Sequence, residues 1–168
     1  EGKPFRLEEF QRRILRDYFG GARQTLVIVP KKNGKSTLVA ALALYHLLVT
    51  ADAEGYIAAN ARDPAPLILN QCRKFIRATP ALKGHLRVKV REIVNELDAG
   101  FVRVLAADKD TVDGVIPTFA IVDELHRAKS TDLLGVFRDG LGPREGKMLV
   151  ITTAGDDSES PLGRMRSE

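Results

Sequence analysis

The 168-residue chain contains no tryptophan, only three tyrosines and seven phenylalanines, and a single cysteine. One cysteine, Cys72, cannot form an internal disulfide framework, and this composition fits a reducing compartment. The scarcity of aromatic residues argues against a stacking platform for single-stranded nucleic acids. No apolar run approaches the roughly 20 residues that span a bilayer, and no signal-peptide pattern opens the chain, so we expect no membrane partner.

Hydrophobic residues make up 44% of the chain and charged residues 29%, which is typical of an ordinary globular protein. This length suits one domain, so we expect residues 1–168 to form a single domain. The sequence begins with Glu1 rather than Met, and its last residues show no clear closing element. We therefore expect the domain to be part of a longer protein.

The formal net charge of +4 is unevenly distributed along the chain. Residues 73–91 contain no acidic side chain and seven basic ones: Arg73, Lys74, Arg77, Lys83, Arg87, Lys89 and Arg91. Such a block attracts a polyanion through phosphate contacts and counterion release. A solvated surface formed by a helix and a hairpin explains the same residues equally well.

Hydrophobic periodicity predicts helices that alternate with short, apolar strands. Helical spacing covers residues 7–19, 36–49, 63–78 and 132–137. Strand patterns cover residues 25–29, 56–59, 118–122 and 148–153, with several short strands between residues 86 and 106. This alternation predicts an α/β fold with a mainly parallel sheet that is covered by helices on both faces.

A short basic loop lies between the strand at residues 25–29 and the helix that follows it. The loop closes in Gly34-Lys35-Ser36, the end of a phosphate-binding pattern, although Val29 stands where that pattern has its first glycine. Backbone N–H groups and the helix N-terminus at such a loop hold phosphate oxygens. The nucleotide-binding residues predicted here are Lys31, Lys32, Asn33, Gly34, Lys35, Ser36 and Thr37.

Three of these side chains have distinct predicted roles. Lys35 would reach the β- and γ-phosphates, the Ser36 hydroxyl would ligate Mg²⁺, and Thr37 would add a hydroxyl toward the α-phosphate. Lys31 and Lys32 would add positive charge close to the γ-phosphate. The alternative is a basic surface loop that precedes a helix.

An acidic pair, Asp123-Glu124, follows the buried strand at residues 118–122. Asp123 is predicted to coordinate Mg²⁺, and Glu124 to polarise an attacking water as general base. The alternative is an acidic pair at a helix N-terminus, which the helix dipole favours. His126 completes Asp-Glu-Leu-His, a pattern typical of helicases. Its spacing from His46 and His85 does not suit a zinc site.

Three motifs occur in a fixed order, Pro30–Ser36, Ile121–His126 and Ile151–Gly155. Together they resemble the ATPase domain of the large terminase subunit of tailed bacteriophages, the motor that packages DNA into procapsids. The resemblance runs from Pro4 to Asp157. It implies a P-loop NTPase fold of the RecA-like, ASCE type, with ATP and Mg²⁺ as cofactors. It also implies that a nuclease domain of the RNase H type lies outside this chain.

The resemblance assigns further roles residue by residue. Gln11 would read the adenine edge, and Lys31 would act as a switch near the γ-phosphate. Thr152 and Thr153 would couple hydrolysis to movement. Arg138 or Arg144 would be an arginine finger supplied to a neighbouring subunit, with Arg138 favoured. Each of these residues also has an ordinary explanation, as a surface polar group or as a strand-end hydroxyl that satisfies the backbone.

The function implied is Mg²⁺-dependent ATP hydrolysis that powers translocation of double-stranded DNA into a viral procapsid. The expected partners are double-stranded DNA, the portal protein, the small terminase subunit and further copies of the chain in a homo-oligomeric ring, expected to be a pentamer. The expected location is the cytoplasm of the bacterial host. Two alternatives stay open: a helicase-type nucleic-acid ATPase, and a nucleotide-binding assembly module that does not hydrolyse ATP.

Overall fold

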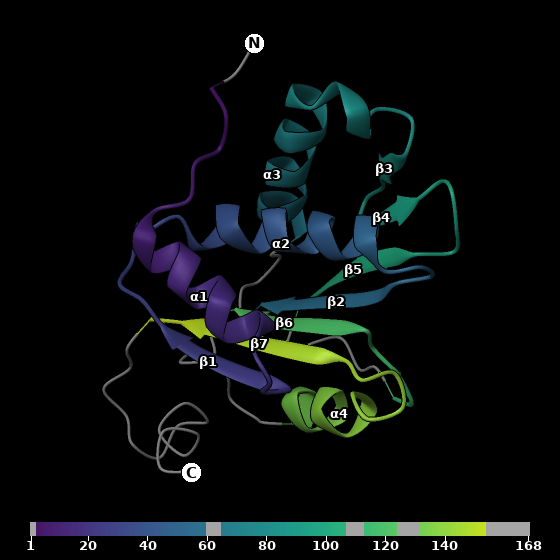
Figure 1. Cartoon of the computed structure of the whole chain (residues 1–168). Coiled ribbons are helices and arrows are strands. Elements are labelled where there is room, and N and C mark those ends of the chain that lie inside the picture. The colour runs from purple at the N-terminus through teal and green to yellow at the C-terminus, as the bar shows by residue number, and fades with distance from the viewer. Residues whose placement is uncertain (1–2, 60–64, 107–112, 124–131, 154–168) are drawn as a thin grey trace.

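The structure of the chain, a computed structural model, describes residues 3–59, 65–106, 113–123 and 132–153 (Figure 1). Helices and strands alternate along these residues, as the sequence predicts. The helices are α1 (Glu9–Phe19), α2 (Lys35–Val49), α3 (Ala65–Ala78), the short 3₁₀ helix η1 (Pro80–Leu82) and α4 (Asp132–Gly140). The strands are β1 (Gln24–Ile28), β2 (Glu54–Ala59), β3 (Leu86–Val88), β4 (Glu92–Asn95), β5 (Phe101–Ala106), β6 (Phe119–Asp123) and β7 (Lys147–Thr152).

The strands form one seven-stranded sheet in the order β1-β7-β6-β2-β5-β4-β3. Five neighbouring strands, β1, β7, β6, β2 and β5, run parallel. Strand β4 runs antiparallel to both of its neighbours, β5 and β3. The predicted mainly parallel sheet is therefore confirmed. The predicted short strands between residues 86 and 106 are also confirmed, as β3, β4 and β5.

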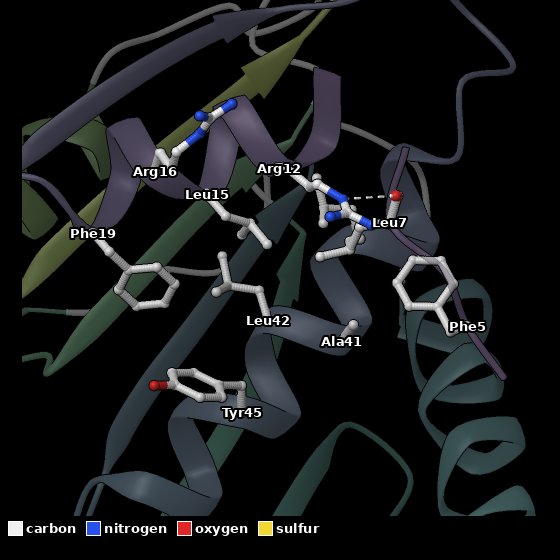
Figure 2. Close-up of a pocket in the computed structure, with 10 residues that line it drawn as sticks. Phe5, Leu7, Arg12, Leu15, Arg16, Phe19, Ala41, Leu42 and Tyr45 are labelled. Carbon is white, nitrogen blue, oxygen red and sulfur yellow. Dashed lines mark hydrogen bonds between the residues drawn. The ribbon is translucent and has the colours of Figure 1, made fainter. Parts of the chain in front are cut away.

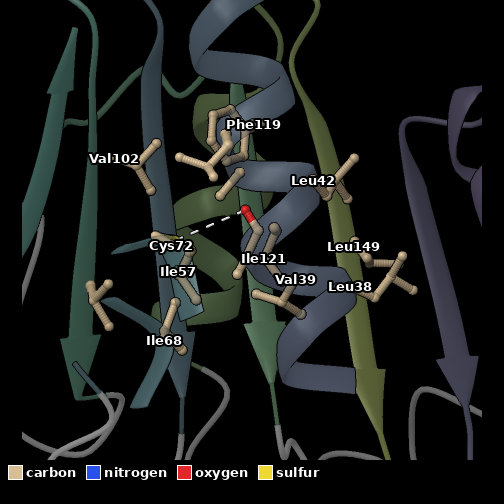
Figure 3. Packing of buried hydrophobic residues seen from close by; sticks show 14 of the residues in the cluster. Leu38, Val39, Leu42, Ile57, Ile68, Cys72, Val102, Phe119, Ile121 and Leu149 are labelled. Carbon is tan, nitrogen blue, oxygen red and sulfur yellow. Dashed lines mark hydrogen bonds between the residues drawn. The ribbon is translucent and has the colours of Figure 1, made fainter. Parts of the chain in front are cut away.

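Helices cover both faces of the sheet, with α1, α2 and α3 on one face and α4 on the other (Figure 1). Alternate residues of each strand enter two separate apolar cores because strand side chains point to opposite faces. On β2, Ile57 packs in the core below α2, and Tyr56 packs in the core above α4. Figure 3 shows the larger core, where Leu38, Val39 and Leu42 of α2 meet Ile121 of β6 and Leu149 of β7.

The ends of α1 follow from its sequence. Glu8 and Gln11 form a reciprocal capping box at the N-terminus, so the helix begins at Glu9 rather than at Leu7, where the apolar pattern starts. Gly20 follows the last residue, Phe19.

The predicted start of α3 at residues 63–64 lies outside the described residues. No helix in the described part of the chain is long and apolar enough to cross a membrane.

Candidate active site

The predicted loop residues, Asp123 and the threonine pair Thr152-Thr153 lie where parallel strands β1, β7 and β6 end. The ends of these strands lie at the same edge of the sheet, because Ile28 pairs with Thr152 and Asp123 pairs with Ile151. The carboxyl edge of a parallel sheet is where ligands bind in open α/β folds. The basic loop leaves β1 at this edge, and Val29 N–H donates to Thr152 O at 2.9 Å.

The loop between β1 and α2 has a braced backbone. Lys32 and Gly34 both adopt positive φ, 64° and 69°, and Gly34 is the N-cap of α2. The Asn33 side-chain amide donates to Pro30 O at 3.1 Å and to Lys31 O at 3.2 Å. The helix therefore starts at Lys35, and the positive dipole end of a helix favours a nearby anion.

Lys35 and Asp123 form an ion pair across the site. Lys35 Nζ lies 3.7 Å from Asp123 Oδ1, and each side chain is only 10% exposed. This buried charge pair lies next to the loop that the sequence predicts to bind phosphate. The oxygen donors of Asp123 and Ser36 are the ligand type that Mg²⁺ prefers, so the residues present fit a magnesium nucleotide.

Gln11 lies against the loop from the side of α1. Its side chain is buried, and its Oε1 accepts a hydrogen bond from Glu8 N–H at 3.0 Å. A Cβ atom at residue 34 would lie 3.3 Å from Gln11 Nε2. The amide nitrogen of Gln11 therefore faces the turn at Gly34, while its oxygen is engaged in the capping box.

Both predicted coupling residues are buried at the end of β7. Thr152 Oγ1 donates to Thr153 O at 3.2 Å, and Thr152 O accepts the hydrogen bond from Val29. The threonine segment is thus bonded directly to the base of the loop. Glu124, the predicted general base, lies outside the described residues, as does His126; Glu124 follows Asp123 directly in the chain.

The two arginine-finger candidates lie at the opposite edge of the sheet. Arg138 Nε donates to Oε1 of Gln24, the first residue of β1, at 3.1 Å. Arg144 Nη2 donates to Asp52 O, in the turn that precedes β2, at 3.0 Å. Both contacts are at the amino ends of the strands, whereas Lys35 is at the carboxyl ends. The structure therefore does not bring either arginine to Lys35 within one chain.

The basic run at residues 73–91 is partly neutralised within the chain. Arg87 Nε pairs with Glu96 at 2.8 Å, and Lys89 Nζ pairs with Glu92 at 2.9 Å. Arg73 donates to Asn70 Oδ1 and to Lys89 O. Among the described residues, Lys74, Arg77 and Lys83 are exposed and form no ion pair. These three cations, in the C-terminal half of α3 and just after it, are therefore exposed and lie outside the ion pairs of the run.

Cys72 and His46 carry reactive groups, but both side chains are buried. Cys72 is buried against α2, and burial raises the pKa of its thiol to about 12, so the nucleophilic thiolate is suppressed. Within the described residues, no group of three or more His, Cys, Asp or Glu side chains could hold a metal ion. His46 is instead hydrogen-bonded to Tyr18, a contact with no signal in the sequence.

Comparison with known proteins bears on these observations. The family described as "Terminase large subunit, ATPase domain" matches residues 11–167 of the chain. The chain belongs to this family. The large terminase subunit of Enterobacteria phage HK97 is 25% identical over 169 residues, which cover 96% of this chain and 31% of that protein. The chain thus spans about a third of the length of this curated relative.

Solved terminases share the fold of this family member. The crystal structure of the HK97 large terminase has a TM-score of 0.82 at 22% identity and covers 96% of this chain and 36% of its own. The ATPase domain of the Thermus phage P74-26 large terminase has a TM-score of 0.72 at 17% identity, covering 91% and 67%. A large terminase from a thermophilic bacteriophage, solved in complex with ADP, has a TM-score of 0.66 at 9% identity, covering 87% and 39%. The fold is the RecA-like P-loop fold of terminase ATPase domains.

Proposed function

We propose that this terminase ATPase domain hydrolyses Mg-ATP at the carboxyl edge of its sheet. The observation that carries the proposal is the meeting of the Gly34-Lys35-Ser36 helix start with Asp123 across a 3.7 Å ion pair. Lys35, Ser36 and the loop backbone would hold the phosphates, with Lys31, Lys32, Asn33 and Thr37 around them. Gln11 would contact the base. Ser36 and Asp123 would hold Mg²⁺, which neutralises phosphate charge when bound.

The proposed reaction is in-line attack of water on the γ-phosphorus. Glu124 accepts a proton from the water as the new P–O bond forms, and the bond from the γ-phosphorus to the bridging oxygen breaks. Lys35 offsets part of the negative charge on the phosphate oxygens in the transition state. ADP and inorganic phosphate leave. Thr152 and Thr153 would couple the loss of the γ-phosphate at the loop to a movement of β7.

We also propose that the arginine finger comes from a second copy of the chain. Arg138 and Arg144 lie at the amino edge of the sheet, so neither serves the nucleotide held at the carboxyl edge of the same chain. In a homo-oligomeric ring, the amino edge of one subunit can face the carboxyl edge of the next. Membership of the terminase family supports such a ring, and we retain a pentamer as the proposed stoichiometry.

The proposed work of the motor is translocation of double-stranded DNA into a procapsid in the bacterial cytoplasm, with the portal protein and the small terminase subunit as partners. Exposed Lys74, Arg77 and Lys83 would contact the phosphate backbone without reading bases, because packaging tolerates any sequence. Reversing their charges should weaken duplex binding and reduce its dependence on salt. The control change Arg13→Glu, at an exposed residue of α1, should leave the salt dependence unchanged.

The experiment that tests the proposal measures phosphate release from ATP against protein concentration, with and without duplex DNA. The wild type is compared with Lys35→Ala and Glu124→Gln. Turnover that rises more steeply than linearly with concentration, and disappears in both variants, is the expected result. Turnover that persists in Lys35→Ala, or ATP binding without any Glu124-dependent turnover at ring-forming concentrations, would contradict a hydrolytic motor and favour a binding module.

A further inference from the structure

Three elements carry the proposed nucleotide contacts, and one buried aromatic cluster joins all three. Gln11 is in the first turn of α1, Lys35 begins α2, and Asp123 ends β6. At the other end of these elements, the Tyr18 hydroxyl of α1 shares a 2.8 Å hydrogen bond with His46 Nε2 of α2. The His46 ring in turn stacks on Phe119, the first residue of β6, with centroids 4.4 Å apart and planes 13° apart.

Tyr18 lies on the same face of α1 as Gln11. The buried residues of this helix are Gln11, Ile14 and Tyr18, whose spacing of three and four residues forms one stripe. Two helical turns therefore separate the Gln11 amide, beside Gly34, from the Tyr18 hydroxyl, beside His46. Any rotation or sliding of α1 at the Tyr18 end is transmitted to Gln11, because a helix moves as a rigid element.

The packing of α1 on α2 alone does not fix this position. A groove of about 610 Å³ runs between the two helices, lined by Leu7, Leu15 and Phe19 on one side and by Leu38, Leu42 and Tyr45 on the other (Figure 2). Apolar contacts are not directional, so they permit small shifts of one helix along another. A hydrogen bond between two buried groups has a narrow range of length and angle.

The Tyr18–His46 bond is also costly to break. Tyr18 has no exposed surface and His46 is 7% exposed, so water cannot replace the lost partner. An unsatisfied buried polar group is costly, and this cost favours the one position of α1 that satisfies both groups. A second hydrogen bond fixes the same end of α1: Lys147 Nζ donates to Gly20 O, just past the C-terminus of the helix, at 2.8 Å.

We propose that Tyr18 and His46 are positioning residues that hold α1 in the register at which Gln11 meets the phosphate loop, and so set the preference of the site for adenine nucleotides. This inference rests on the proposed function, in which Gln11 contacts the base. Neither residue touches the nucleotide. Their effect is on base selection and affinity and not on the chemical step.

The test compares binding of ATP and GTP to the wild type and to Tyr18→Phe, which keeps the ring and removes only the hydroxyl. We expect ATP affinity to fall about fivefold, the factor given by one hydrogen bond of typical net strength, with little change in GTP affinity. The turnover number at saturating ATP should stay the same. In a Gln11→Ala background, Tyr18→Phe should cause no further loss of base preference.

A second variant separates positioning from stability. In Tyr18→Phe/His46→Phe both polar partners are replaced by apolar rings, so no buried group lacks a partner and stability should largely return. The preference for ATP over GTP should stay reduced, because the directional bond is absent. Recovery of that preference together with stability would overturn the inference, as would an unchanged preference in Tyr18→Phe.

The outcomes also separate this inference from the proposed function. If wild-type protein binds ATP in a Lys35-dependent manner while Tyr18→Phe keeps full base preference, only the positioning role is wrong. If wild-type protein binds no ATP, or binds it equally well in Lys35→Ala, both the nucleotide site and the positioning role are wrong.

Discussion

Lys35 Nζ and Asp123 Oδ1 lie 3.7 Å apart, although 88 positions separate the two residues in the chain and β6 reaches β1 only through β7. Both side chains are only 10% exposed, so the attraction between the two charges acts in a site with little access to water. A magnesium nucleotide would bring new partners for both, anionic oxygens for the ammonium and a cation for the carboxylate. The ion pair therefore keeps the proposed phosphate ligand, Lys35, and the proposed Mg²⁺ ligand, Asp123, charged at the site although both are largely buried.

Asp123→Asn tests the carboxylate. The substitution keeps the size of the side chain and removes its charge, so we expect phosphate release to fall by about 100-fold and the Mg²⁺ concentration for half-maximal rate to rise. Phosphate release measured across a Mg²⁺ titration gives both quantities. Asp139→Asn, at an exposed residue of α4, is the matched control and should behave as wild type. An unchanged Mg²⁺ dependence in Asp123→Asn would remove Asp123 from the proposed metal site.

Glu124→Gln tests the proposed base. The amide keeps the shape of the side chain but cannot accept the proton of water, so turnover should fall by about 10²- to 10⁴-fold. ATP affinity should change little, because Glu124 does not hold the phosphates in the proposed reaction. Filter binding of labelled ATP, combined with single-turnover hydrolysis, separates the two quantities. Equal loss of binding and turnover would indicate a structural role for Glu124.

Mixing inactive variants tests whether the arginine acts on a neighbouring subunit. A Lys35→Ala subunit keeps both arginines, and an Arg138→Ala/Arg144→Ala subunit keeps its loop, so mixed rings would contain complete sites. We expect the mixture to release phosphate faster than the two proteins measured separately. The matched control mixes Lys35→Ala with Glu124→Gln, whose losses fall in the same site, and should show no recovery. An equally inactive arginine mixture would argue against a trans arginine.

Local patterns predicted much of this molecule correctly. The loop at Gly34-Lys35-Ser36, the strand before it and the helix after it are consecutive in the chain, so periodicity and glycine chemistry identified them. The end of β6 at Asp123 was predictable for the same reason, since a buried strand that stops at an acidic residue is a local signal.

Contacts between distant residues were not predictable from one sequence. Tyr18 and His46 each occupy an apolar helical stripe, where an aromatic ring is normally a core residue, and nothing local pairs one with the other. Arg138 and Arg144 have no pattern that indicates which sheet edge they occupy. Their places follow from hydrogen bonds to Gln24 and Asp52, 114 and 92 positions away.

Gly55→Ala tests the packing that supports the aromatic cluster. Gly55 of β2 pairs with Phe119 of β6, and a Cβ at residue 55 would lie 2.3 Å from Phe119 Cζ. The Phe119 ring is stacked on His46 and cannot move freely, so we expect a loss of about 1–3 kcal/mol in the free energy of unfolding. Denaturant unfolding measures this quantity.

Gly135→Ala is the control for Gly55→Ala, because it makes the same substitution at a position with free space. Gly135 lies within α4, and a Cβ there would meet nothing within 4 Å. Alanine is favoured over glycine inside a helix, so this change should increase stability by up to about 1 kcal/mol. A stability for Gly55→Ala equal to that of the wild type would show that the cluster around Phe119 can rearrange.

The buried imidazole of His46 makes stability depend on pH. Burial, with a smaller contribution from the charge of Lys147, lowers the pKa of His46 from 6.5 to about 4. Within the described part of the chain, none of the groups that face this ring is an anion: they are the Tyr18 hydroxyl, Lys147 and the rings of Phe19, Tyr45 and Phe119. Between pH 6.5 and 4 the unfolded chain therefore binds a proton at His46 more readily than the folded chain does.

Stability from this group should be fully present above pH 6.5, should fall as pH decreases toward 4, and should change no further below 4. The total loss is about 3 kcal/mol. Urea unfolding of wild type and of Tyr18→Phe/His46→Phe at half-unit pH steps measures it, because all other titrating groups are present in both proteins and cancel in the difference. The two curves should lie close together above pH 6.5 and should diverge as pH falls to 4, because only the wild type loses stability through His46. Parallel curves over this range would show that His46 titrates alike in the folded and unfolded chain.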